Sequence, residues 1–165
     1  DSHNAMGEKV EEPMDFSKKN RISIDDLHEM TTQVFLPINY KDKNSFKLEN
    51  SQRKFIWEAM SASPSKLGLN KEKYPGNFVK FFVRGDEKES DTIKKSLKIY
   101  NKVGTAYGQI TETAFIESDV NRFILTATMY VNDNNIINDD VYEYESIGIP
   151  FFASLGKEIL NFLNK

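Results

Sequence analysis

Cysteine is absent from this sequence, and histidine occurs only at His3 and His28. The chain can therefore form no disulfide and has no thiol nucleophile, although the redox state of its compartment stays open. A zinc site built on histidine is disfavoured, because two widely separated histidines fall short of the ligand sets that zinc takes in proteins. His28 lies off the apolar stripe of a predicted helix, so we expect it on the solvent side rather than in a catalytic centre.

The chain also has no basic patch and no long apolar run. Its formal net charge is −3, and its lysines stand in short groups among acidic residues. This pattern predicts a solvated surface and no nucleic-acid partner. No apolar run approaches the length that spans a membrane, so we expect no membrane span. The 165 residues are enough for one domain with a core of its own.

The chain begins with a polar segment followed by a helix signal. Residues 1–22 contain Pro13 and few apolar side chains, and we expect them to lie extended against another part of the molecule. Ser23 opens a capping-box pattern with Asp26, which predicts a helix that ends at Pro37. Residues 23–165 are then predicted to form a single domain, with a helical part up to about residue 94.

A second helix is predicted from about Asn50 to Ser61, with Trp57 as a packing anchor. A long loop then leads to Phe78–Val83. The composition of these six residues favours a strand, whereas their length equally suits a short buried helix, so both alternatives stay open. The inner face of the second helix is expected to carry Phe55, Ile56, Ala59 and Met60.

The chain from about residue 95 onward predicts a sheet. One strand leads into Lys102, and two more cover residues 111–118 and 122–131. The short link at residues 119–121 favours an antiparallel hairpin. Residues 132–140 are rich in Asn and Asp, but they lack the glycine and the closing glutamate of a calcium loop, so we expect a solvated turn.

A last helix is predicted from about Ser146, with Pro150 in its first turn and with Gly148 and Gly156 allowing close approach to the sheet. The predicted fold class is therefore α+β, with a three-stranded antiparallel meander packed against a C-terminal helix and preceded by two or three helices. The apolar stripe of the last helix is expected to comprise Ile147, Phe151, Phe152, Leu155, Ile159, Phe162 and Leu163.

The triplet Lys102-Val103-Gly104 is the chemistry-bearing motif of this unit. Alone it is a weak signal, since a surface lysine at a strand end is common. Its context is a strand with Lys-x-Gly, two further strands and a long C-terminal helix. In this order the chain resembles the C-terminal half of the penicillin-recognising serine hydrolases, in particular the class A β-lactamase-like branch. The resemblance covers roughly residues 20–165 and implies a partial β-lactamase-like fold.

The resemblance implies a role for each residue of the motif. Lys102 would lie on an edge strand beside the active-site groove, where its charge assists proton transfer and holds a substrate carboxylate. The backbone N–H of Thr105 would belong to the oxyanion hole. Val103 and Gly104 would border the substrate, but Val103 stands where the family prefers Thr or Ser, which would remove one hydroxyl contact.

The family's nucleophilic serine has no convincing match in this sequence. Ser63–Lys66 copies the Ser-x-x-Lys pattern, and Ser90–Thr92 partly copies the Ser-Asp-Asn motif that follows it. The two lie too close together for the helical lobe that separates them in the family, and Ser63 falls at a helix end instead of a helix start. We therefore expect a C-terminal portion that lacks the nucleophile-bearing half and is inactive alone.

The resemblance further implies acyl-enzyme hydrolysis of an amide, ester or β-lactam, no cofactor, and a periplasmic or envelope location. Partners would be a small-molecule or peptide substrate and either the missing N-terminal half or another chain that covers the sheet. The alternative is a non-catalytic α+β interaction module, which includes a degenerate family member that binds peptide or cell-wall fragments. In that case Lys102 is an ordinary surface lysine without a cleft.

Overall fold

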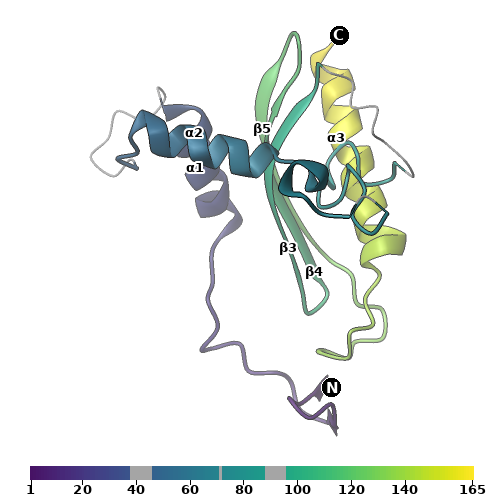
Figure 1. The fold of residues 1–165 in the computed structure, drawn as a ribbon. Helices are drawn as coiled ribbons and strands as arrows, with labels where there is room; N and C mark the ends of the chain where they lie inside the picture. Colours follow the sequence, from purple (N-terminus) through teal and green to yellow (C-terminus); the bar gives the residue numbers. More distant parts are fainter. Residues whose placement is uncertain (38–45, 71, 88–95) are drawn as a thin grey trace.

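The computed structural model describes residues 1–37, 46–70, 72–87 and 96–165 and has the predicted α+β fold (Figure 1). One antiparallel sheet lies at its centre, with α3 on one face and with α1 and α2 on the other. The principal elements are α1 (Ile24–Phe35), α2 (Asn50–Ser61), β3 (Lys98–Ala106), β4 (Gln109–Glu117), β5 (Arg122–Tyr130) and α3 (Ile149–Leu163). A 3-10 turn spans Pro64–Leu67, and a π-helical turn spans Tyr144–Gly148 before α3.

The sheet is the predicted meander, in the order β3-β4-β5. Tyr107 and Gly108 form a two-residue hairpin loop, both with positive φ, between β3 and β4. The register places Lys102 opposite Thr113, and Thr113 opposite Thr126. Because side chains alternate between the faces of a strand, these three residues share one face of the sheet.

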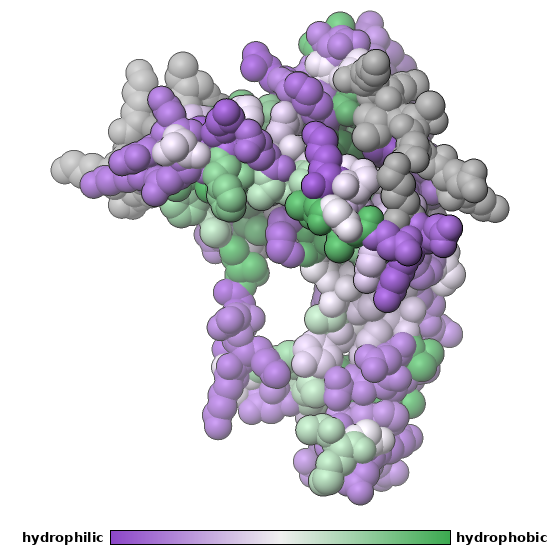
Figure 2. All heavy atoms as spheres, viewed as in Figure 1, coloured by the Kyte–Doolittle hydropathy of each residue, from purple (hydrophilic) through white to green (hydrophobic). Residues whose placement is uncertain are grey.

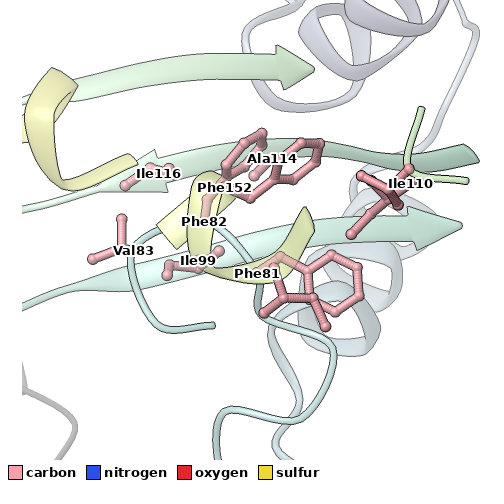
Figure 3. Close-up of a cluster of buried hydrophobic side chains, with 10 residues drawn as sticks. Phe81, Phe82, Val83, Ile99, Ile110, Ala114, Ile116 and Phe152 are labelled. Atoms are coloured by element: carbon pink, nitrogen blue, oxygen red, sulfur yellow. The ribbon is translucent and has the colours of Figure 1, made fainter. Parts of the chain in front are cut away.

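The main core lies between α3 and the sheet (Figure 3). It collects side chains from α3, from the strands and from residues 77–87. Phe82 and Phe152 have no exposed surface, and their rings stack with centroids 5.1 Å apart. The other buried members of this core are Phe81, Val83, Ile99, Ile110, Ala114, Ile116, Val131 and Ile149.

An aromatic cluster joins α1 and α2 to the opposite face. Phe35 from α1 stacks on Phe115 with centroids 5.1 Å apart, and Tyr100 lies beside both rings. Trp57 of α2 packs 5.3 Å from Phe35 and 5.6 Å from Tyr100. The prediction that Trp57 anchors α2 is therefore confirmed.

The predicted inner face of α2 is wrong in part. Phe55 is 72% exposed, and Ala59 is exposed as well, whereas Ile56 and Met60 are partly buried. The reason is the orientation that Trp57 imposes. Residues two positions apart lie on nearly opposite faces of a helix. Because Trp57 faces the sheet, Phe55 faces solvent.

The predicted stripe of α3 is also offset from the face that is buried. Phe152 is buried as expected, but Phe151 is 51% and Phe162 is 73% exposed. The helix instead turns its small residues inward, with Ala153 and Gly156 buried. A Cβ at Gly156 would lie 2.7 Å from the backbone nitrogen of Val83, so this close approach requires glycine.

Residues 78–83 form neither a strand nor a helix but a series of turns. Val79 and Val83 both have positive φ, of 57° and 70°, which is a strained conformation for a β-branched residue. The strain is offset because Phe81, Phe82 and Val83 are buried against the sheet.

The N-terminal segment is extended for much of its length, and it also contains a pair of short strands. Two short strands, β1 (Ser2–His3) and β2 (Lys9–Val10), pair with each other, and Ser2 also bridges Ile137. Farther along, the ring of Phe16 meets the ring of Tyr107 edge-on, at a centroid distance of 5.3 Å. Within the described part of the chain, no helix is long and apolar enough to cross a membrane.

Candidate functional site

Lys102 lies on the outer strand of the sheet, on the face toward α1 and α2. β3 pairs with β4 alone in its sheet, so its other side is an edge. Lys102 is exposed, and its ammonium group donates to the carbonyl of Val103, which belongs to that edge. The cation is therefore accessible from the edge of β3.

The backbone N–H of Thr105 points outward from the edge of β3, where it could bind an anion. Ala106 and Gln109 flank the two-residue hairpin loop and therefore exchange hydrogen bonds. Hydrogen-bonded and non-hydrogen-bonded pairs alternate along an antiparallel ladder, so the Thr105–Ile110 pair is non-hydrogen-bonded. The N–H of Thr105 consequently points away from β4, toward the same edge as the carbonyl of Val103.

Val103 and Gly104 lie on opposite faces of the sheet. The side chain of Val103 is half-buried and packs against the core on the α3 face, away from Lys102. Gly104 lies on the face that carries Lys102, and a Cβ built on it would meet nothing within 4 Å. The surface beside Lys102 is therefore flat and open at Gly104.

The Ser-x-x-Lys pattern of residues 63–66 is not brought to Lys102. Ser63 precedes the 3-10 turn, and its hydroxyl is hydrogen-bonded to that of Ser65 at 3.0 Å. Ser63 and Lys66 line a cavity of about 270 Å³ together with Lys80, and Lys102 is not part of that lining. The partial copy of the Ser-Asp-Asn motif, Ser90–Thr92, lies outside the described residues.

A buried polar network beneath β3 was not predicted. Glu112 is fully buried on the α3 face and accepts a hydrogen bond of 2.6 Å from the N–H of Phe82. Its other carboxyl oxygen accepts from the amide of Asn101, and the oxygen of that amide accepts from the ammonium group of Lys80. Lys80 also donates to the carbonyls of Met60 and Ile99, at 2.7 and 3.1 Å.

Burial shifts both ionisable groups of this network toward neutrality. Removal from water raises the pKa of Glu112 from 4.5 to about 7, against the hydrogen bonds from Phe82 and Asn101 and the charge of Lys80. Burial likewise lowers the pKa of Lys80 from 10.5 to about 8, and the charge of Glu112 opposes that shift. The network fastens Val79, Lys80 and Phe82 to the sheet, so we assign it a structural role.

One signal in the sequence could have revealed this network. Glu112 has the same strand parity as Ala114 and Ile116, so an acid stands on the apolar face of β4. Lys80 similarly interrupts the apolar run of residues 78–83. Charged residues at inward positions require partners, although the pattern does not name those partners.

The face of the sheet that carries Lys102 is open toward the N-terminal segment. Figure 2 shows an opening between the N-terminal segment and the β3–β4 hairpin. Phe16 of that segment contacts Tyr107 at the hairpin tip. Two cross-strand rows of residues lie on this face of the sheet. We call their uncovered part, together with the helix residue above it, the polar shelf: Lys102, Gly104, Thr111, Thr128 and His28.

His28 belongs to this face and not to bulk solvent alone. It projects from α1, and its Nδ1 lies 3.0 Å from the hydroxyl of Thr126 on β5. The sequence placed His28 off the apolar stripe, which is correct, since it is exposed. Its contact with the sheet was missed because the polar partner lies 98 residues away.

Among the described residues, no group of three or more acidic or histidine side chains could hold a metal ion. The site is thus a surface of one ammonium group, one imidazole, several hydroxyls and an exposed backbone edge. Comparisons with family models, with curated proteins and with solved structures found no match for this chain.

Proposed function

We propose that this chain is the C-terminal, sheet-bearing portion of a β-lactamase-like serine hydrolase and that it forms one wall of the substrate groove. The observation that carries the proposal is the shared edge of β3. The ammonium group of Lys102 and the N–H of Thr105 are both directed to that edge, where the resemblance requires a carboxylate-binding cation and an oxyanion donor.

The nucleophile must then come from another polypeptide segment. Within the described residues, Ser63 and Lys66 share a cavity with Lys80 instead of with Lys102. The chain by itself would bind a substrate carboxylate at Lys102 without forming an acyl-enzyme. Exported members of such a family act in the periplasm or envelope, and we propose the same location for this protein.

The partner that completes the fold would cover the side of the molecule opposite β3. β5 is the other edge of the sheet, and edge strands present unpaired backbone groups to a further strand. Phe151 and Phe162 are exposed on the adjoining helix α3, at 51% and 73%. We propose that the nucleophile-bearing half supplies a strand to β5 and an apolar helix to α3.

A non-catalytic binding module is the second candidate. The observation in its favour is Val103, whose side chain packs into the core, so the strand offers no hydroxyl beside Lys102 for a substrate carboxylate. In this candidate the groove would hold its ligand without cleaving it.

The test is a titration of the ¹⁵N-labelled chain with benzylpenicillin, followed by NMR and by intact mass. The proposal expects saturable shifts of the amides from Lys102 to Thr105 and an unchanged mass. Lys102→Ala should abolish the shifts. Lys98→Ala is the matched control, because Lys98 is an exposed lysine on the same strand and face, and it should leave the shifts intact.

Two results would overturn the proposal. Absence of shifts at Lys102–Thr105 would remove the ligand site on which it depends. A stoichiometric adduct that disappears in Ser63→Ala would show a complete hydrolase centred on Ser63, contrary to the geometry of the 3-10 turn.

A further inference from the structure

A series of hydrogen-bonded hydroxyl groups runs from His28 on α1 across β5 and β4 and back to Thr31 on α1. From β5 to α1, the contacts are Thr126 to Thr113 at 2.8 Å and Thr113 to Thr31 at 2.8 Å. The hydroxyl of Thr31 donates to the carbonyl of Leu27 at 2.9 Å. His28 closes the other end with its contact of 3.0 Å to Thr126.

The number of hydroxyl protons fixes the donor-to-acceptor direction of these hydrogen bonds. Each threonine hydroxyl has a single proton to donate. Thr31 gives its proton to a carbonyl, so Thr113 must donate to Thr31, and Thr126 must donate to Thr113. No hydroxyl proton is left for His28, so its Nδ1 must be the donor to Thr126. This order alone satisfies all of the contacts.

The consequence is that the neutral imidazole ring of His28 has one tautomer. With the proton on Nδ1, the neutral ring has its lone pair on Nε2. Among the described residues, Nε2 of His28 has no hydrogen-bond partner, and the side chain is exposed. His28 therefore offers a hydrogen-bond acceptor above the polar shelf.

The floor of the shelf is also made of acceptors. The hydroxyls of Thr111 and Thr128 lie 2.8 Å apart, and the hydroxyl of Thr128 also lies 3.3 Å from the carbonyl of Ile110 and 3.4 Å from Oε1 of Gln109. When Thr128 donates to either of these two oxygens, Thr111 donates to Thr128. Both hydroxyl protons are then used within the sheet, and lone pairs remain for a ligand.

The charge of the shelf lies at its other end. Lys102 and Thr126 are two strands apart in one row, which separates their Cα atoms by roughly 10 Å. A ligand on the shelf therefore meets a cation beside β3, two acceptors in the middle and a further acceptor at His28. Gly104 leaves the approach to this surface unobstructed.

We infer that the polar shelf binds a sugar acid, meaning a carboxylate that carries adjacent hydroxyl groups, with the carboxylate on Lys102 and the hydroxyls donating to Thr111, Thr128 and His28. The 2.8 Å between the two threonine oxygens suits a pair of neighbouring hydroxyls. Successive N–H groups on one side of an extended peptide are instead roughly 7 Å apart and cannot reach both oxygens. The inference rests on the proposed function in using Lys102 as the carboxylate site, and it adds the substrate class.

The first test is the state of His28 itself. Imidazole ¹⁵N shifts of the neutral ring should show the proton on Nδ1. In Thr126→Val the series of hydroxyls is broken, and this preference should be lost. Thr32→Val is the matched control, since Thr32 lies on the same helix and bonds only the carbonyl of His28. A proton on Nε2 in the unmodified chain would overturn the inferred direction and with it the inference.

The second test is ligand binding, with D-glucuronate as the probe in an NMR titration. We expect shifts at Gly104, Thr111 and Thr128 and at the His28 ring, with affinity roughly fivefold weaker in Thr126→Val, because one oriented hydrogen bond is worth about 1 kcal/mol. D-Glucose, which lacks the carboxylate, should bind at least about tenfold more weakly, because a hydrogen bond to a charged group is worth about 1.5–3 kcal/mol. Equal shifts with acetate would indicate anion binding at Lys102 alone, and equal binding of triglycine would indicate a peptide site; either result overturns the sugar-acid assignment.

These outcomes separate the inference from the proposed function. Shifts with benzylpenicillin but none with D-glucuronate would overturn the shelf and leave the hydrolase proposal standing. The reverse pattern would overturn the hydrolase proposal, and the shelf would then belong to a sugar-acid-binding module.

Discussion

The two faces of the three-stranded sheet are completed in different ways. The α3 face is closed by a continuous apolar core, and the polar network of Glu112, Asn101 and Lys80 within it is internally hydrogen-bonded. The α1 and α2 face is closed at its aromatic end and at the buried contact between Thr31 and Thr113, and beyond these it presents hydroxyls, His28 and Lys102. The comparison indicates that apolar burial is concentrated on one face and exposed polar groups on the other.

Breaking the closed face should have the largest effect. Phe82→Ala deletes a fully buried ring that stacks on Phe152, and we expect a loss of about 3–5 kcal/mol in the free energy of unfolding. Urea denaturation measures this loss. Phe55→Ala, at a ring that is 72% exposed on α2, is the control and should change stability by less than about 0.5 kcal/mol. Equal losses in both variants would contradict the contrast between the faces.

The polar network should give the closed face its own pH dependence. The pKa of Glu112 is raised in the folded state, so its contribution to stability is fully present below pH 4.5 and is lost as the pH rises through about 7. The pKa of Lys80 is lowered, so its contribution is present above pH 10.5 and is lost as the pH falls through about 8. Stability should therefore be lowest between about 7 and about 8.

Glu112→Gln tests this dependence, because glutamine carries no titrating proton. Between pH 4.5 and about 7 the unmodified chain should lose on the order of 2–3 kcal/mol of unfolding free energy that the variant does not lose. Urea titrations at several pH values measure the difference. Glu58→Gln, at an exposed acid on α2, should follow the unmodified chain. An unchanged slope in Glu112→Gln would show that Glu112 does not titrate in this range.

The β3–β4 hairpin has two glycines that should differ in their tolerance of a side chain: Gly108 is sterically constrained, and Gly104 lies on the open face. Gly108 has a φ of +81°, and a Cβ there would lie 2.9 Å from the Cβ of Asn132. Gly108→Ala should cost about 1–3 kcal/mol, measured by urea denaturation. Gly104→Ala meets no atom within 4 Å, so it should cost far less and instead obstruct ligands on the polar shelf. A larger loss at Gly104 than at Gly108 would contradict the geometry of both.

The sequence predicted the sheet better than it predicted the faces of the helices. Strand alternation and a short hairpin link identified β4 and β5, since both signals are local. Helix orientation depends on neighbours that are distant in sequence, so Phe55 and Phe151 were wrongly expected inside. Neither the strand nor the short helix considered for Phe78–Val83 is correct, because its turns are held by Glu112 and Asn101 from the sheet.

The candidate site divides in the same way. The Lys-x-Gly triplet nominated Lys102 and Thr105 as candidates, and the hairpin register then supplied the direction of the Thr105 N–H. His28 was assigned to solvent because its partner Thr126 comes from another element. A single side chain can be placed from local pattern, whereas a constellation requires the fold.

The smallest predicted effect concerns the cap of α1, the helix that carries His28 over the open face. Ser23 accepts a hydrogen bond from the N–H of Asp26 at 3.0 Å and donates to its carboxylate at 2.6 Å. Ser23→Ala should therefore lower the free energy of unfolding by about 1 kcal/mol. Ser154→Ala, at an exposed position within α3, is the control and should be neutral or slightly stabilising, because alanine is the better helix former. Urea denaturation compares the two, and the His28 ring shifts report whether the first turn frays. If Ser23→Ala loosens His28 while the closed face keeps its stability, the two faces are energetically separable. A loss as large as that of Phe82→Ala would mean that α1 and the α3 core unfold as one unit.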